Sequence, residues 1–196
     1  MHTAAVADAE GAGRCAHRLG RAGALAGQAA TRPLYHRIPD QLSYIPEQRS
    51  IVTALTVADS LRLGGSHLGR SLELNPELGD HLRRKAGLLS GGQQQMLALA
   101  RALSRHPDCL LADELSLGLA PALVRRLLTA IRTAADTGVA VLVVEQHALQ
   151  ALELADRSYV LARGRIHLTG PATTLRNRLS ELERSYLTGL HPGKPQ

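Results

Sequence analysis

Aromatic residues are nearly missing from this chain, which among its 196 residues has no Trp, no Phe and four Tyr. Proteins that bind single-stranded nucleic acid commonly stack successive bases on aromatic side chains. We therefore expect no nucleic-acid partner, although the net charge is +6 at pH 7. Much of this excess lies in residues 157–196, which hold seven basic and two acidic residues, and we attribute it to a solvated surface.

Cysteine and long apolar runs are also scarce. The two cysteines, Cys15 and Cys109, cannot supply a disulfide framework or a cysteine metal cluster, which fits a reducing cytosol. No apolar run approaches the ~20 residues that cross a bilayer. Residues 1–30 lack the apolar segment of a secretory signal peptide. The expected location is therefore the cytoplasm.

Apolar residues are plentiful, at 44% of the chain, and their pattern indicates one globular domain. Residues 42–45 predict a short strand, residues 109–114 an apolar strand that ends in two carboxylates, and residues 139–144 an all-apolar strand. Between the last two, residues 121–138 predict a helix with Pro at its start and Gly at its end. This alternation predicts an α/β fold with a mainly parallel sheet flanked by helices.

The most informative stretch is residues 89–103, with the sequence LSGGQQQMLALARAL. Ser90 is a good N-cap, Gly91 and Gly92 let a ligand approach the backbone, and apolar residues then recur at helical spacing. The free N–H groups and the dipole at such a helix start favour a phosphate. A capped core helix after a glycine turn would explain the glycines as well. The whole fifteen-residue string decides between the two, because it resembles the signature motif of ATP-binding-cassette (ABC) ATPases.

This resemblance assigns roles to residues in three other stretches. Asp113 and Glu114 follow an apolar strand as in the family's Walker B motif, so Asp113 would hold Mg²⁺ and Glu114 would be the general base for the attacking water. Glu47 and Gln48 resemble the Q-loop, which touches the metal, the attacking water and the transmembrane partner. His147 resembles the switch histidine, which contacts the γ-phosphate.

The resemblance also says where the signature motif would act. In the family, two subunits sandwich two ATP molecules, and the signature of one subunit faces the phosphate-binding loop of the other. Ser90, Gly91, Gly92 and Gln93 are therefore expected at the γ-phosphate of an ATP molecule that a partner subunit binds.

The implied domain is an ABC nucleotide-binding domain over residues 31–196. Within it the resemblance implies a small helical subdomain at about residues 55–105, with helices at 55–64 and 71–85. It also implies a final hairpin that includes residues 159–166.

Residues 1–30 match the family least. They hold eleven Ala and five Gly, no clear strand is predicted among them, and the N-terminal strands of the family are expected to be incomplete. The best candidate for a degenerate phosphate-binding loop is residues 8–16, and its nucleotide-binding residues would be Gly11, Gly13, Arg14 and Cys15. An intact loop has Lys and then Ser or Thr at its end, where Lys reaches the phosphates and the hydroxyl binds Mg²⁺. Arg is bulkier than Lys and sulfur is a poor Mg²⁺ ligand, so we expect weak ATP binding.

The implied function is that of the ATP-binding subunit of an ABC importer, which couples ATP binding and hydrolysis to solute import. The expected solutes are branched-chain amino acids, and the expected cofactors are ATP and Mg²⁺. The expected partners are transmembrane permease subunits and a second ABC ATPase subunit, which would hold the chain at the inner face of the membrane. Two alternatives stay open: a catalytically silent subunit that contributes only its signature motif in trans, and a soluble ABC ATPase.

Overall fold

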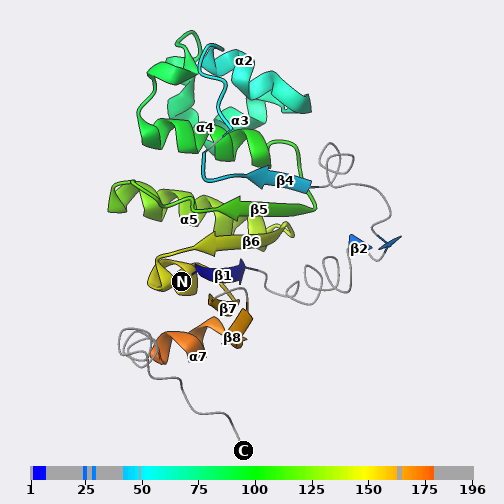
Figure 1. Ribbon diagram of the computed structural model, residues 1–196. Helices are drawn as coiled ribbons and strands as arrows, with labels where there is room; N and C mark the ends of the chain where they lie inside the picture. Colours follow the sequence, from blue (N-terminus) through cyan, green and yellow to red (C-terminus); the bar gives the residue numbers. More distant parts are fainter. Residues whose placement is uncertain are drawn as a thin grey trace, which may run out of the picture.

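The computed structural model describes residues 2–7, 24–25, 28–29, 42–48, 50–162 and 165–178. Within these residues, six strands form one sheet in the order β4-β5-β6-β1-β7-β8 (Figure 1). The strands of this sheet are β1 (His2–Ala7), β4 (Leu42–Ile45), β5 (Cys109–Asp113), β6 (Ala140–Glu145), β7 (Arg157–Ala162) and β8 (Arg165–Pro171). A separate antiparallel pair joins β2 (Ala24–Leu25) to β3 (Gln28–Ala29).

The strands β4, β5 and β6 are parallel neighbours, as the sequence predicts. Side chains alternate between the two faces of each strand. On one face, Leu110 and Ala112 of β5 join Ile45 of β4 and Val141 of β6 in the main hydrophobic core. Because parallel strands end at the same edge of a sheet, the residues that follow these three strands lie at one edge.

The remaining pairs are antiparallel. β1 lies between β6 and β7 and is antiparallel to both, and β8 pairs with β7 as the predicted final hairpin. The fold is α/β, but its sheet is mixed, because only the β4–β5 and β5–β6 pairs are parallel among the described strands. The expectation of no strand in residues 1–30 is wrong. The sequence HTAAVA has few β-branched residues, so β1 owes its conformation to two paired neighbours rather than to propensity.

A group of short helices stands beyond β4, at the top of Figure 1. It comprises α2 (Val57–Arg62), η2 (Leu63–Gly65), α3 (Leu68–Leu74), η3 (Pro76–His81), η4 (Ala86–Leu88) and α4 (Gly91–Leu103). Thr56 caps α2, since its Oγ1 accepts a hydrogen bond from the Asp59 N–H at 3.1 Å. A continuous helix over residues 71–85 is not found. α3 ends before Asn75 because Asn75 precedes Pro76, and a proline disfavours the α conformation in the residue before it.

Helix α4 belongs to two hydrophobic cores at once. Met96, Leu99 and Leu103 pack into the main core with the sheet and a later helix. Leu97 and Ala100, on another side of α4, pack into a second core with residues of α2, η3 and η4. This double burial explains why α4 is apolar around most of its circumference, and it makes α4 the connection between the short helices and the sheet.

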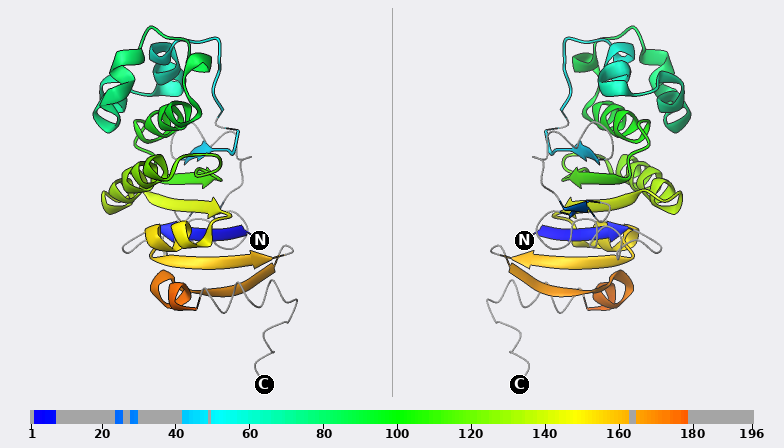
Figure 2. Two further views of the ribbon diagram at one scale, coloured as in Figure 1. Left: turned by 90° about the vertical axis from the view of Figure 1, so that its left-hand side faces the viewer. Right: turned by 90° about the vertical axis from the view of Figure 1, so that its right-hand side faces the viewer.

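Three further helices continue from α4 along the sheet: α5 (Pro121–Asp136), α6 (Ala148–Leu154) and α7 (Ala172–Asn177). α4 contacts α5, α5 contacts α6 and α6 contacts α7, so the four helices form a row beside the sheet (Figure 2). α5 begins with Pro121 as predicted, and its Leu127 and Ile131 are buried in the main core. In the part of the chain that the structure describes, no helix combines the length and the hydropathy needed to span a membrane.

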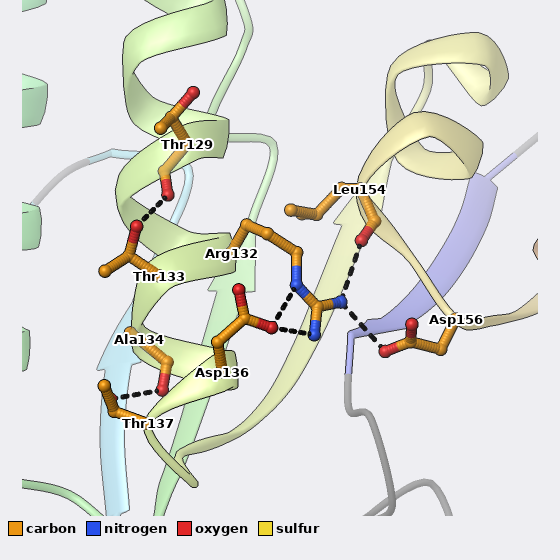
Figure 3. Close-up of polar contacts among 8 residues, drawn as sticks. All are labelled: Thr129, Arg132, Thr133, Ala134, Asp136, Thr137, Leu154 and Asp156. Atoms are coloured by element: carbon orange, nitrogen blue, oxygen red, sulfur yellow. Dashed lines mark hydrogen bonds and ion pairs between the residues drawn. The ribbon is translucent and has the colours of Figure 1, made fainter.

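The end of α5 is tied to the chain before β7 by Arg132 (Figure 3). Its Nε and Nη2 donate to Asp136 Oδ1 at 2.9 and 2.6 Å, and its Nη1 donates to Asp156 Oδ2 at 2.9 Å. Hydrogen bonds to Asp136 and then to Asp156 raise the pKa of Arg132, so the guanidinium stays charged. Because these groups are partly exposed, the contact orients the two elements more than it stabilises them.

Candidate functional site

The ends of the three parallel strands bring the predicted catalytic and metal-binding residues to one edge of the sheet. Glu47 and Gln48 follow β4 after a proline, Asp113 ends β5 and Glu114 follows it, and His147 stands just beyond β6 as the N-cap of α6. The register of the ladder keeps these ends level, since each of the three strands pairs residue for residue with its neighbour. The structure therefore assembles at one edge five residues that the sequence predicts.

Glu47, Gln48 and Asp113 line a single hollow of about 450 Å³. Its lining is completed by Tyr44, Pro46, Ser50 and Ile51. Among the described residues, no group of three His, Cys, Asp or Glu side chains could hold a metal ion by itself. Mg²⁺ is commonly bound by one or two carboxylates together with waters and phosphate oxygens. The oxygen donors of this hollow fit such an ion, with Asp113 and Glu47 as its carboxylates.

Glu114 has a backbone conformation that residues other than glycine rarely adopt, with φ at +51°. Its side chain is buried, with 6% exposed, and its N–H donates to the carbonyl of Val144 in β6 at 2.9 Å. Such conformations persist only where the surrounding structure holds them, and they gather at functional sites. A carboxylate held next to Asp113 in this way suits a general base whose position must not drift.

Sequence reasoning missed Glu145, which ends β6 and is fully buried, with 0% exposed. Its Oε1 accepts from the Ser116 N–H at 3.0 Å, and its Oε2 accepts from the Ser116 Oγ–H at 2.6 Å. Burial raises the pKa of Glu145, the hydrogen bonds from Ser116 lower it, and the charge of Glu114 raises it further. The signal in the sequence was an acidic residue that closes an all-apolar strand, because a buried carboxylate needs partners.

His147 is exposed, and its role stays a prediction. Its carbonyl accepts hydrogen bonds from the Gln150 and Ala151 N–H groups at 3.0 and 3.2 Å, which starts α6. Its imidazole is close enough to the end of β6 that its charge lowers the pKa of Glu145.

The start of α4 shows the predicted cap in full. Ser90 Oγ accepts from the Gln93 N–H at 3.3 Å, and the Ser90 N–H donates to Gln93 Oε1 at 3.0 Å, which together make a capping box. The side-chain amide of Gln93 also lies 3.0 Å from His81 Nε2, to which it donates. Ser90 and Gln93 are thus held by each other and by the end of η3.

The two signature glycines differ in what the fold asks of them. Gly91 begins α4. A Cβ on Gly92 would lie 1.9 Å from Leu123 Cδ2, so any side chain here would force Leu123 to move where α4 crosses the start of α5. The expectation that both glycines serve a close ligand therefore needs a second cause for Gly92, which is helix packing.

The signature residues line a different hollow from the strand ends. Ser90 and Gln93 face a space of about 200 Å³ together with Asn75, the N-cap of η3, and residues of η3, α4 and α5: Glu77, Leu78, His81, Met96, Leu123 and Arg126. An exposed ion pair between Arg126 and Glu77, at 3.0 Å, spans one side of it. The predicted site residues thus form two groups, and which ATP molecule each group would serve stays a prediction.

Gly11, Gly13, Arg14 and Cys15 lie outside the described residues, and their assignment stays a prediction. The strand before them can be described. β1 is antiparallel to β6, with Thr3 opposite Glu145 and Ala7 opposite Val141. The chain therefore leaves β1 at the edge where β6 begins, whereas a phosphate-binding loop follows a strand that ends beside the other strand ends. The direction of β1 does not support a phosphate-binding loop at residues 8–16.

The family model of the ABC transporter matches residues 17–116, which include the signature and both Walker B carboxylates. The high-affinity branched-chain amino acid transport ATP-binding protein BraG of Pseudomonas aeruginosa is 44% identical over 142 residues, covering 67% of this chain and 61% of BraG. A probable branched-chain amino acid transport ATP-binding protein, LivF of Archaeoglobus fulgidus, is 32% identical over 159 residues, covering 76% of this chain and 67% of LivF. The phosphonates import ATP-binding protein PhnC of Hydrogenovibrio crunogenus is 39% identical over 122 residues, covering 58% and 45%.

A solved structure described as an ATP binding subunit of an ABC transporter superposes with a TM-score of 0.68, covering 90% of this chain and 82% of that one. At 23% identity this likeness shows the fold alone. The chain spans about three fifths of the length of BraG. The family model and the similarity to BraG and LivF show the family. This chain belongs to the ABC transporter family of ATP-binding proteins.

Proposed function

We propose that the chain is the ATP-binding subunit of an ABC importer, in which hydrolysis of Mg²⁺-bound ATP is coupled to the movement of a solute. The observation that carries this proposal is the gathering of Glu47, Gln48 and Asp113 in one hollow, with the buried side chain of Glu114 directly after Asp113 in the chain. Mg²⁺ would neutralise charge on the phosphates when it is bound. The residues of the chain then have three tasks: Asp113 would hold the metal ion, Glu114 would take a proton from the attacking water, and Glu47 or Gln48 would orient that water.

Branched-chain amino acids are the proposed solutes, because BraG and LivF are named for their transport. The cassette itself does not touch the solute in this function, since a transmembrane permease subunit would. The proposed partners are therefore permease subunits and a second ATP-binding subunit, with the chain at the inner face of the membrane.

A second candidate is a subunit that hydrolyses nothing itself and lends its signature to a partner's ATP. Two observations favour it. The cap of Ser90 and Gln93 is complete, whereas β1 leads away from the edge that carries Asp113. In this function Ser90 would donate its hydroxyl to the γ-phosphate of the partner's ATP.

One experiment separates the two candidates. The full chain is assembled with permease subunits and an ABC ATPase subunit whose phosphate loop is intact but whose catalytic glutamate is replaced by Gln. Hydrolysis in this assembly must use Glu114, so the proposed function predicts activity that Glu114→Gln reduces by ~10²–10⁴-fold.

The silent candidate predicts no activity in that assembly. It predicts activity once the partner's glutamate is restored, and Ser90→Arg then abolishes it while Glu114→Gln does not. Assemblies inactive with either partner would contradict both candidates.

A further inference from the structure

We propose that Glu145 is a positioning residue for Glu114: with Ser116 it clamps the segment after β5 onto the end of β6. This inference deepens the proposed function and rests on it. The motifs that the resemblance names assign no role to Glu145.

The clamp consists of two hydrogen bonds between buried side chains, and the bond from the Ser116 hydroxyl is short. Both oxygens of the Glu145 carboxylate are used, one by the Ser116 N–H at 3.0 Å and one by the Ser116 hydroxyl at 2.6 Å. Both side chains are buried, with 0% of Glu145 and 5% of Ser116 exposed. Charge-assisted bonds of this kind fix orientation as well as distance.

The three residues that follow β5 are each held in place. The Glu114 N–H donates to Val144 at 2.9 Å, Leu115 is buried in the main core with 1% exposed, and Ser116 is clamped by Glu145. The +51° φ of Glu114 lies in a sparsely populated region, so the neighbouring contacts must offset its cost. Releasing Ser116 would free the peptide groups next to Glu114 and let its carboxylate drift.

A purely structural role would not call for a carboxylate here. Burying an ionised carboxylate is expensive, and well-packed apolar residues often replace buried charges without loss of stability. The charge of Glu114 raises the pKa of Glu145 further, so the ionised form of Glu145 has a second cost besides burial. Two acceptor oxygens aimed at Ser116 explain why the position is acidic in spite of these costs.

The test uses four variants of the full chain. Glu145→Ala removes the clamp, and Ser116→Ala removes only its hydroxyl bond, which keeps the test valid if Glu145→Ala does not fold. Glu145→Gln is the rescue, because its Oε1 still accepts from the Ser116 N–H and its amide donates to the hydroxyl, which can also accept. Ser104→Ala is the matched control, since Ser104 is a buried serine whose hydroxyl donates to the Arg101 carbonyl at 3.1 Å, away from the strand ends.

The first readout is amide hydrogen exchange at Ser116 in the isolated chain, measured by NMR. Loss of a hydrogen bond to a charged acceptor should speed local exchange by about 10- to 100-fold in Glu145→Ala, with Glu145→Gln and Ser104→Ala near the unmodified chain. Equal Ser116 exchange in Glu145→Ala and Ser104→Ala would overturn the clamp, whatever the chain does with ATP.

The second readout is steady-state ATP hydrolysis in the assembly with the glutamate-disabled partner. We expect kcat to fall by about 10- to 100-fold in Glu145→Ala, and in the same direction in Ser116→Ala, with KM unchanged and Glu145→Gln restoring the rate. An unchanged kcat, or a raised KM alone, would overturn the positioning role. An inactive unmodified assembly would instead overturn the proposed function, and it would do so before any variant is compared.

Discussion

The start of α4 and the end of β5 each present polar groups to a hollow of their own. The two places differ in how far apart in the sequence the residues that hold them lie. At the start of α4, Ser90 and Gln93 are three residues apart and bond to each other. At the end of β5, Ser116 is held by Glu145, which is 29 residues away in the chain. The first arrangement forms wherever the helix forms, whereas the second exists only once the sheet has assembled. The geometry at Ser90 and Gln93 therefore depends mainly on residues nearby in the chain. The geometry at the end of β5 depends on the whole sheet.

The largest effect is expected from breaking the long-range arrangement. Glu145→Ala leaves the Ser116 N–H and hydroxyl buried without their acceptors, so the free energy of unfolding should fall by about 2–4 kcal/mol. Urea unfolding followed by circular dichroism measures this, with Ser104→Ala as the control. A loss no greater than that of the control would mean that the strand ends do not depend on this contact.

A smaller loss is expected at Gly92, where the start of α4 contacts a distant residue of α5. Gly92→Ala puts a methyl group against Leu123 of α5, and overpacking of this kind costs about 1–3 kcal/mol. The double variant with Leu123→Ala should recover much of the loss, because the clashing atom is removed. Additive losses in the double variant would refute the packing explanation of Gly92.

Breaking the local arrangement should cost less again. Ser90→Ala removes the acceptor for the Gln93 N–H, and loss of an N-cap costs about 1 kcal/mol. Ser90→Asp, which keeps a side-chain acceptor at the cap, should stay close to the unmodified chain in the same urea measurement. If Ser90→Ala destabilised the chain as much as Glu145→Ala, the contrast between local and long-range support would fail.

The smallest effects are expected at Arg132, where one side chain makes both kinds of contact on the surface. Asp136→Ala removes its local partner and Asp156→Ala its distant partner. Because exposed ion pairs are screened by solvent, each change should lower the free energy of unfolding by at most about 1 kcal/mol. Thermal unfolding at low and high salt measures this, and a loss that persists undiminished in high salt would contradict a screened surface pair.

The same contrast explains what the sequence could predict. The cap at Ser90 and the proline start of α5 depend on residues within a few positions of each other, and both are as predicted. β5 and β6 were predictable because each is a largely apolar run, and β4 because its short strand pattern stops at Pro46.

What could not be predicted depends on distant partners. β1 is an alanine-rich segment that is a strand only between β6 and β7, and its antiparallel direction follows from that pairing. The hydrogen bonds of Glu145 and the contact of Gly92 with Leu123 join segments whose proximity no local pattern indicates. Carboxylates at strand ends could be predicted as a group, but not the buried neighbour that fixes one of them.

The capping box of α4 has a consequence for the thermodynamics of any anion that arrives there. Ser90 Oγ already accepts from the Gln93 N–H, and the Gln93 side chain is already shared between Ser90 and His81. A phosphate oxygen that accepts from the Ser90 hydroxyl would leave this bond in place, because one hydroxyl oxygen can donate and accept at the same time. The helix start would then be ordered in both the free and the bound state, so little conformational entropy would be lost on binding.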